Sequence, residues 1–313
     1  MGEKEIRGFP GGVHPTDGQD KSLTAGKLVK EYWPGSVTIL SEQSLNAKCS
    51  LMVKPGDQVL AGQLIGEPQS FTAAPLHASV SGIVREVKKI SSQDREILAC
   101  VIERTGEPEE KSFPHENEAA DISEYSEDVI IEGLLTGGLI GMGGAGFPVH
   151  KKYETEKRID TILINGAECE LFLTCDCRVM VEQGYGVING TRLMLKASGA
   201  DQAYICIEDN KPDAIKNLQK ILEEMKSQGY FEKEKPVQVQ VLPTKYPQGG
   251  ERQLIESVLG REVPMGGLPA DVGVIVSNVG TAKAAADVVL GKKPLISRIV
   301  TVTGNVKEPG NYL

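Results

Sequence analysis

Glycines and carboxylates are concentrated in the middle of the chain, between residues 141 and 170. Four glycines fall within six residues there, and a glycine has no side chain to cover its backbone N–H group, so such a loop suits phosphate binding. Asn165 follows an apolar run at 161–164, which places polar groups at the carboxyl end of a strand, where α/β folds bind ligands. These features predict a nucleotide or flavin site, with the first candidates Gly141, Gly143, Gly144, Gly146, Asn165, Glu168 and Glu170.

The glycine spacing also matches the dinucleotide-binding fingerprint G-x-G-x-x-G. That fingerprint follows a strand. Residues 128–135, which precede the glycine motif of this chain, instead have the apolar spacing of a helix. We therefore do not expect an ordinary Rossmann opening. A plain glycine-rich turn is the alternative interpretation of the motif.

Charged residues follow the glycine loop. Glu168 and Glu170 are two residues apart, so in an extended segment both side chains share a face, where they could orient a nicotinamide or a ribose. Lys152, four residues after Pro148, is positioned to neutralise a phosphate or a reduced flavin. The alternatives are a solvated acidic turn and a surface lysine.

Two further glycine turns follow apolar runs. Residues 246–252 read Tyr-Pro-Gln-Gly-Gly-Glu-Arg and open a helix, whose N-terminus favours anions. Residues 277–281 read Ser-Asn-Val-Gly-Thr. Because the carboxyl ends of parallel strands meet at one edge of a sheet, the three turns are expected to converge on one ligand site.

The elements that must position these turns alternate between strand and helix. This alternation predicts a mostly parallel α/β sheet over residues 128–298. Asp209 or Asn210 can cap the third helix. The expected helices are 128–135, 178–198, 212–226, 251–259 and one beginning near 281, and the expected strands are 161–164, 203–207, 237–242 and 272–276.

The first hundred residues have a different organisation. Residues 1–36 are rich in Gly and Pro and are expected to be extended, and 37–103 contain short apolar runs separated by glycine turns, as in a small β-sandwich or barrel. Segment 53–84 resembles the barrel-sandwich hybrid of lipoyl and biotinyl carriers, but 67–70 lacks the attachment Lys, so we expect a non-carrier domain. The acidic stretch 104–127, with Pro108 and Pro114, is expected to be a linker.

Composition excludes several functional classes. The chain has 313 residues, 25% of them charged, and its net charge of −9 disfavours nucleic acid as a partner. No apolar run is long enough to span a bilayer, so any membrane attachment is expected through a protein partner. The start of the chain lacks the apolar core of a signal peptide. None of the six cysteines forms C-x-x-C, so we expect reduced thiols and no metal site.

Several longer motifs together resemble one family. They are Gly-Gly-Val-His-Pro at 11–15, Gly-Gly-Ala-Gly-Phe-Pro at 143–148, Asn-Gly-Ala-Glu-Cys-Glu at 165–170, Leu-Pro-Thr-Lys-Tyr-Pro-Gln-Gly at 242–249 and Gly-Gly-Leu-Pro-Ala-Asp-Val-Gly at 266–273. The chain is similar over nearly its whole length to RnfC, the NAD(H)-interacting subunit of the ion-translocating ferredoxin:NAD oxidoreductase (Rnf) complex. The resemblance implies an N-terminal barrel-sandwich hybrid domain and an FMN-binding α/β domain.

The α/β part also resembles the flavin-bearing, NADH-oxidising subunit of respiratory complex I. This resemblance implies hydride transfer between NAD(H) and FMN, and it assigns no residue as a proton donor. The four loop glycines would wrap FMN and Phe147 would stack on NADH. The other residues that it assigns to the cofactors are Lys152, Asn165, Glu168, Glu170, Tyr246, Gly249, Glu251, Asn278 and Thr281.

At some positions the residue type differs from that of the families that the chain resembles. Met142 and Ala167 stand where complex I has Arg and Asp, and Leu171 replaces the usual Pro. Residues 299–313 look like the start of a β-grasp domain of the SLBB type, and the family continues into two [4Fe–4S] motifs that are absent here. The resemblance implies a cytoplasmic protein, peripheral to the membrane through other subunits of the complex.

Two rival functions remain open on the sequence. One is a soluble RnfC-like electron carrier that serves a dedicated reductase. The other is a non-flavin, quinone-binding or scaffold subunit like NqrA, which shares the Gly-Gly-x-His-Pro start.

Overall fold

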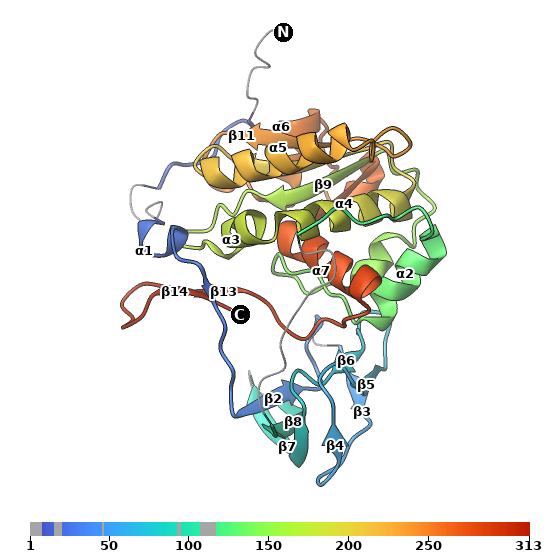
Figure 1. Cartoon of the computed structure of the whole chain (residues 1–313), viewed down its shortest axis with the longest axis vertical. Coiled ribbons are helices and arrows are strands. Elements are labelled where there is room, and N and C mark those ends of the chain that lie inside the picture. Colours follow the sequence, from blue (N-terminus) through green and yellow to red (C-terminus); the bar gives the residue numbers. More distant parts are fainter. Residues whose placement is uncertain (1–7, 16–20, 46, 93–94, 107–116) are drawn as a thin grey trace.

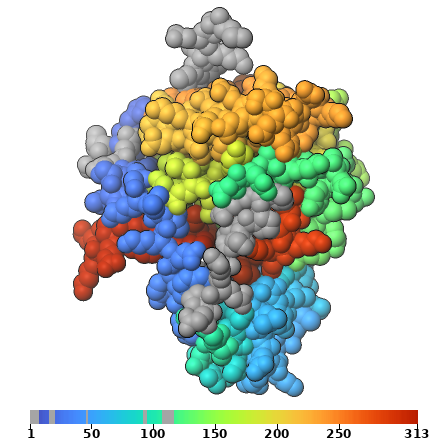
Figure 2. Space-filling view, in the orientation of Figure 1, coloured from blue at the N-terminus to red at the C-terminus, as the bar shows by residue number. Residues whose placement is uncertain are grey.

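The computed structural model describes residues 8–15, 21–45, 47–92, 95–106 and 117–313. It forms two lobes, an α/β lobe and a β-rich lobe, shown in the upper and lower parts of Figure 1. In the space-filling view, red residues near the C-terminus lie between the two lobes (Figure 2). Parts of the expected N-terminal segment (1–7 and 16–20) and of the expected linker (107–116, with Pro108 and Pro114) lie outside the described residues.

The α/β lobe is built on a four-stranded parallel sheet with the order β11-β10-β9-β12. The chain runs outward from β9 through β10 to β11, and then returns to place β12 on the other side of β9. The strand order therefore reverses between β9 and β12, and such switch points form ligand crevices at the carboxyl ends of the strands. The bounds are β9 Thr161–Gly166, β10 Gln202–Glu208, β11 Val237–Leu242 and β12 Val274–Asn278.

Helices cover both faces of this sheet. Alternate residues of β9 face opposite sides, so Ile162 and Ile164 pack into the larger core, whereas Leu163 packs with Leu254 and Ile255 of α6. The larger core also contains side chains of α2, α3, α4, α5 and α7. The helices are α1 Ser22–Ala25, α2 Glu127–Thr136, α3 Cys175–Glu182, α4 Gly184–Ser198, α5 Pro212–Ser227, α6 Glu251–Leu259 and α7 Val279–Gly291, with 3-10 turns η1 Val149–Lys152 and η2 Pro269–Val272.

Two helix predictions were wrong. The helix expected over 178–198 is two helices, α3 and α4, which are separated by Gln183 with non-helical angles (φ −129°, ψ 35°). Asp209 and Asn210 do not cap α5, whose N-cap is Lys211 without a side-chain hydrogen bond. Asp209 Oδ1 instead accepts the backbone N–H of Thr244 at 3.1 Å, because the ends of β10 and β11 lie side by side.

The β-rich lobe is a sandwich of two antiparallel sheets, β2-β8-β7-β4 and β3-β5-β6. Its core includes Ile39, Ile65, Val84 and Ile102, which come from both sheets. The expected β-sandwich is therefore confirmed. The strands are β2 Ser36–Leu40, β3 Cys49–Leu51, β4 Gln58–Val59, β5 Leu64–Pro68, β6 Leu76–His77, β7 Gly82–Ser92 and β8 Arg95–Arg104.

A third, small sheet joins the N-terminal segment to the C-terminal end of the described chain. Strand β14 (Gly310–Tyr312) pairs in parallel with β1 (Val29–Lys30) and antiparallel with β13 (Val300–Val302). Within β14, Asn311 Oδ1 accepts a hydrogen bond from the hydroxyl of Thr174, the residue before α3, at 3.0 Å. This sheet therefore fastens the N-terminal segment to the start of α3. Within the described residues, no helix is both long enough and apolar enough to cross a membrane.

Close packing of α4 on α7 gives a testable result. A Cβ at Gly190 of α4 would lie 1.6 Å from the backbone oxygen of Ala282 in α7. We expect Gly190→Ala to destabilise the fold by about 1–3 kcal/mol or more, although alanine favours helix over glycine by up to about 1 kcal/mol. Urea unfolding measures the difference. The matched control is Gly186→Ala, where the nearest atom to a Cβ would be a side-chain atom, Lys283 Cγ, at 3.1 Å. An equal loss of stability in both variants would contradict this explanation.

Candidate functional site

A cavity of about 430 Å³ opens at the carboxyl ends of β9 and β12, where the strand order reverses. We call it the site cavity. All three glycine turns predicted from the sequence contribute to its wall, which also includes most of the other predicted residues. The predicted residues that line it are Gly141, Gly143, Gly146, Phe147, Lys152, Asn165, Glu170, Tyr246, Gly249, Glu251, Asn278 and Thr281.

The first turn, residues 141–148, is held by one internal and two external hydrogen bonds. Gly141 N donates to Phe147 O at 2.8 Å and closes the loop. The Ser44 hydroxyl of the β-rich lobe donates to Gly146 O at 2.6 Å, and Met142 N donates to the Thr281 hydroxyl at 2.9 Å. The loop is therefore fixed in shape before any ligand arrives.

The same turn keeps backbone donors unused. Within the described part of the chain, the N–H groups of Gly143, Gly144 and Gly146 donate no hydrogen bond. Gly144 and Gly146 have φ of +122° and +63°, in a region that side-chain-bearing residues rarely adopt. Successive free N–H groups in such a loop form a concave site for an anion. Gly144 itself does not line the cavity.

The second turn packs against the end of β9. Asn165 Nδ2 donates to Gly249 O at 2.8 Å, and Gly249 N donates to Cys169 Sγ at 3.2 Å. A Cβ at Gly249 would lie 3.2 Å from the same sulfur, so glycine allows this close approach. The turn leads directly into α6, which begins at Glu251 at the cavity wall.

The third turn begins α7. Asn278 caps this helix, since its Oδ1 accepts the N–H of Gly280 at 2.8 Å. Its Nδ2 donates to Asp176 Oδ2 at 2.6 Å and so connects the site cavity to α3. Thr281, one turn further along α7, holds the first loop through Met142.

One cation and two carboxylates line the site cavity. Lys152 Nζ donates to Val276 O at 2.6 Å. Burial lowers the pKa of Lys152, and the charge of Glu251 opposes this shift. Glu170 and Glu251 are both exposed at the wall. The cavity wall therefore combines backbone amide donors, the Lys152 ammonium and two exposed carboxylates.

Glu168 does not share a face with Glu170, so that prediction was wrong. Glu168 has a left-handed φ of +49°, which turns the chain after β9, so the segment is not extended. The Glu168 side chain is buried away from the site cavity, and its Oε1 accepts the backbone N–H of Asp176 at 2.7 Å. Its Oε2 lies 3.8 Å from Lys21 Nζ of the N-terminal segment.

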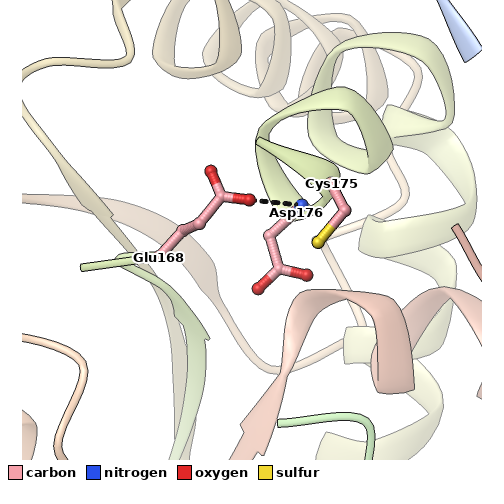
Figure 3. A group of neighbouring side chains, drawn as sticks. All are labelled: Glu168, Cys175 and Asp176. Atoms are coloured by element: carbon pink, nitrogen blue, oxygen red, sulfur yellow. Dashed lines mark hydrogen bonds between the residues drawn. The ribbon is translucent and has the colours of Figure 1, made fainter. Parts of the chain in front are cut away.

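Glu168, Cys175 and Asp176 form a cluster behind the site (Figure 3). Loss of contact with water raises the pKa of Glu168 to about 8, and the charge of Asp176 adds to the rise, whereas Lys21 and Lys211 oppose it. Desolvation likewise raises the pKa of Asp176 to about 6, against the hydrogen bond from Asn278. Two lysines already supply positive charge here, so we assign the cluster no metal.

The raised pKa of Glu168 predicts a pH-dependent stability. The folded protein keeps this carboxyl protonated up to about pH 8, whereas the unfolded chain loses the proton near the ordinary pKa of 4.5. Ionisation is therefore easier in the unfolded state, and the contribution to stability, complete below pH 4.5, is lost as pH rises to about 8. Glu168→Gln, which mimics the protonated form, should gain roughly 2–4 kcal/mol relative to the parent between about pH 5 and pH 8.

Urea unfolding of both proteins at several pH values measures this difference. Glu124→Gln, a change at an exposed position in the segment before α2, is the control and should follow the parent at every pH. A constant difference between parent and Glu168→Gln over this range would contradict the raised pKa.

The sequence interpretation missed some of the cavity wall. Val276 and Ser277 precede Asn278 on β12, and the rule that strand ends carry the ligand site would have included them. Gly250 adjoins Gly249 and is part of the same turn. Cys169 lines the cavity together with its neighbour Glu170, because the left-handed turn at Glu168 interrupts the side-chain alternation of an extended strand. The residues missed are Ala145, Cys169, Pro247, Gly250, Val276 and Ser277.

Two family models match the chain. The RnfC barrel-sandwich hybrid domain matches residues 7–107, and the Nuo51 FMN-binding domain of complex I matches residues 135–287. The second range contains all three glycine turns. Among solved structures, an NAD⁺-reducing [NiFe]-hydrogenase in the H₂-reduced state is similar, with a TM-score of 0.54 and 25% identity over 60% of this chain and 37% of that chain.

Curated relatives match almost the whole chain. A subunit of the proton-translocating ferredoxin:NAD⁺ oxidoreductase complex of Clostridium ljungdahlii is 41% identical over 98% of this chain and 65% of its own length. Its Na⁺-translocating counterpart from Acetobacterium woodii is 38% identical over 96% of this chain and 66% of its own length. The chain thus spans about two thirds of the length of these relatives. Together with the hybrid and FMN-binding domains, these matches show that the chain belongs to the RnfC family.

Proposed function

We propose that this chain binds FMN in the site cavity and exchanges hydride between NAD(H) and the bound flavin. The observation that carries the proposal is the convergence of three glycine turns at the switch point between β9 and β12, with unused N–H groups in the first turn. Such donors fit the phosphate and polar ring edge of FMN. The match to an FMN-binding domain supports the same assignment.

The residues have separate roles in this proposal. The N–H groups of the first turn and the ammonium of Lys152 hold the anionic and electron-rich parts of the flavin. Phe147, which is half-buried at the cavity wall, offers its ring to the nicotinamide. Glu170 and Glu251 accept hydrogen bonds from the nicotinamide nucleotide. FMN, when bound, supplies the conversion between two-electron and one-electron transfer.

Two of the residues assigned from the sequence take different roles. Glu168 lies outside the cavity wall, and it supports the site through the backbone N–H of Asp176, whose side chain holds Asn278. Gly144 shapes the first turn through its φ of +122°. We therefore propose positioning roles for both residues.

We propose that the chain works within the RnfC subunit of an Rnf-type complex, attached to the cytoplasmic face of the membrane through the other subunits. The support comes from the curated relatives, which are named as subunits of ion-translocating complexes. Clusters of the [4Fe–4S] type, expected from the family in the part beyond this chain, would be the electron partners of the flavin.

The test uses the purified chain with added FMN. Flavin fluorescence should change saturably with one site per chain, and NADH should reduce the bound flavin under anaerobic conditions. Reduction by dithionite controls for flavin that is bound but inaccessible to NADH. A folded chain without saturable FMN binding at tens of micromolar would reject the proposal and favour the NqrA-like, non-flavin alternative.

A further inference from the structure

A second cavity, of about 390 Å³, lies between the two lobes. We call it the interlobe cavity. Its wall is formed by Trp33 in the segment before β2, the end of β8, Met142 of the first glycine turn, α7 and the segment 292–299. In Figure 1, α7 lies in the part of the α/β lobe that adjoins the β-rich lobe. The cavity is separate from the site cavity, although both touch the first glycine turn.

The walls of the interlobe cavity are largely apolar. Trp33 and Val80 come from the β-rich side, whereas Val179 and Val288 come from α3 and α7. An apolar cavity at a junction of domains is a typical place for a small ligand, and its volume lies within the usual range of about 300–1,000 Å³. A ligand with a hydrocarbon or aromatic body would therefore gain from burial here.

The polar part of the wall is strongly positive. The described residues that line it include a single acidic side chain, Asp287, whose Oδ2 already lies 2.7 Å from Lys283 Nζ. Positive charges therefore outnumber negative charges in this wall. The cationic residues of the wall are Arg104, Lys283, Lys292, Lys293 and Arg298.

An unpaired guanidinium nitrogen of Arg104 indicates that the cavity would bind an anion. The Nη1 atom of Arg104 is buried and has no hydrogen-bond partner within the described part of the chain. A buried, unpaired donor on a charged group costs free energy, and an anion in the cavity would remove that cost. A second cation of the wall, Arg298, is held in place by a hydrogen bond, in which its Nη2 donates to Met142 O at 3.2 Å.

We propose that the interlobe cavity binds a monomeric anionic amphiphile, with an apolar body against Trp33 and Val288 and a carboxylate or phosphate head on the Arg104 side. Charge complementarity selects the head, and the apolar walls select the body. The site is independent of FMN, since the residues that carry the argument do not line the site cavity. Binding here would place the ligand against Met142, whose N–H donates to Thr281 of the site cavity.

Trp33 is the only tryptophan of the chain and lines this cavity, so its fluorescence reports occupancy directly. Dodecanoate, titrated below its micelle concentration into the 313-residue chain without FMN, should change Trp33 fluorescence saturably, with one site by calorimetry. Dodecanol, which has the same chain without the charge, should bind at least about tenfold more weakly. Acetate, which has the charge without the chain, should not bind.

Removal of the Arg104 charge tests the head-group site. Arg104→Gln should weaken dodecanoate binding about tenfold or more. Arg85→Gln is the matched control, because Arg85 lies on β7 outside the cavity and pairs with Glu103 at the surface. Should Arg104→Gln fail to fold, Lys292→Gln at the end of α7 is expected to weaken binding in the same direction.

Any of the following results would overturn the proposal. They are no saturable Trp33 response to dodecanoate, equal affinities for dodecanoate and dodecanol, and parental affinity in a folded cation variant. A response to phosphatidylglycerol vesicles without any response to monomeric dodecanoate would also reject it, because the ligand would then be a membrane surface.

Discussion

Gly143→Val is expected to abolish FMN binding while the protein remains folded. Gly143 is exposed on the first glycine turn and lines the site cavity. A Cβ there would lie 3.4 Å from the Cβ of Asn278, another residue of the cavity wall. We therefore expect the two branches of valine to occupy cavity space and to cover the neighbouring N–H groups. We expect the dissociation constant to rise at least about a hundredfold, which corresponds to about 2.8 kcal/mol.

Gly143 is a sharper test than Gly144. At Gly144 the φ of +122° strains any side-chain-bearing residue, so a loss of binding there would combine backbone strain with obstruction. The matched control is Gly35→Val, at an exposed glycine with open space around its Cβ and no left-handed φ. Flavin fluorescence titration measures binding, and urea unfolding verifies the fold of both variants. Parental affinity in Gly143→Val would show that FMN does not lie on this turn.

The sequence was sufficient to predict most of the α/β lobe. Runs 161–164 and 237–242 are both rich in β-branched residues. The first lies between Asp160 and Asn165 and the second between Pro236 and Pro243, and the structure contains them as β9 and β11. The parallel pairing followed from the helices between these strands. What the sequence did not show is the strand order, since the return of β12 to the side of β9 depends on tertiary packing.

Two of the errors have identifiable physical causes. The break between α3 and α4 falls before Gly184, where a Cβ would lie 2.7 Å from Asn217 Nδ2 of α5. This contact between distant residues has no signal in the local periodicity. The turn at Glu168 is similar, because a non-glycine residue at a φ of +49° is rare and period-two alternation assumes an extended chain.

The burial of Glu168 changes how the carboxylates of the site are understood. The sequence pattern predicts that Glu168 and Glu170 form one acidic pair. In the structure Glu168 is buried outside the cavity wall, whereas Glu170 lines the cavity. The buried carboxyl reaches Asn278 only through Asp176. Two carboxylates from different elements, Glu170 after β9 and Glu251 at the start of α6, instead face the same cavity.

Glu170→Gln and Glu251→Gln should therefore slow the reduction of bound flavin by NADH and weaken NADH binding. Each carboxylate can accept a charge-assisted hydrogen bond from a ribose hydroxyl or the carboxamide, worth about 1.5–3 kcal/mol. Loss of one such bond predicts roughly a tenfold to hundredfold higher dissociation constant for NADH. FMN affinity should change less, because the proposed flavin contacts are backbone N–H groups and Lys152.

Anaerobic stopped-flow measurements of flavin reduction at increasing NADH give both the rate and the affinity. Glu256→Gln on the same helix, outside the site cavity, is the matched control for Glu251→Gln and should behave as the parent. Dithionite should reduce all variants equally, since it needs no nicotinamide contacts. If Glu170→Gln and Glu251→Gln keep the parental rate and affinity for NADH, while FMN still binds, the nicotinamide does not lie between these two carboxylates.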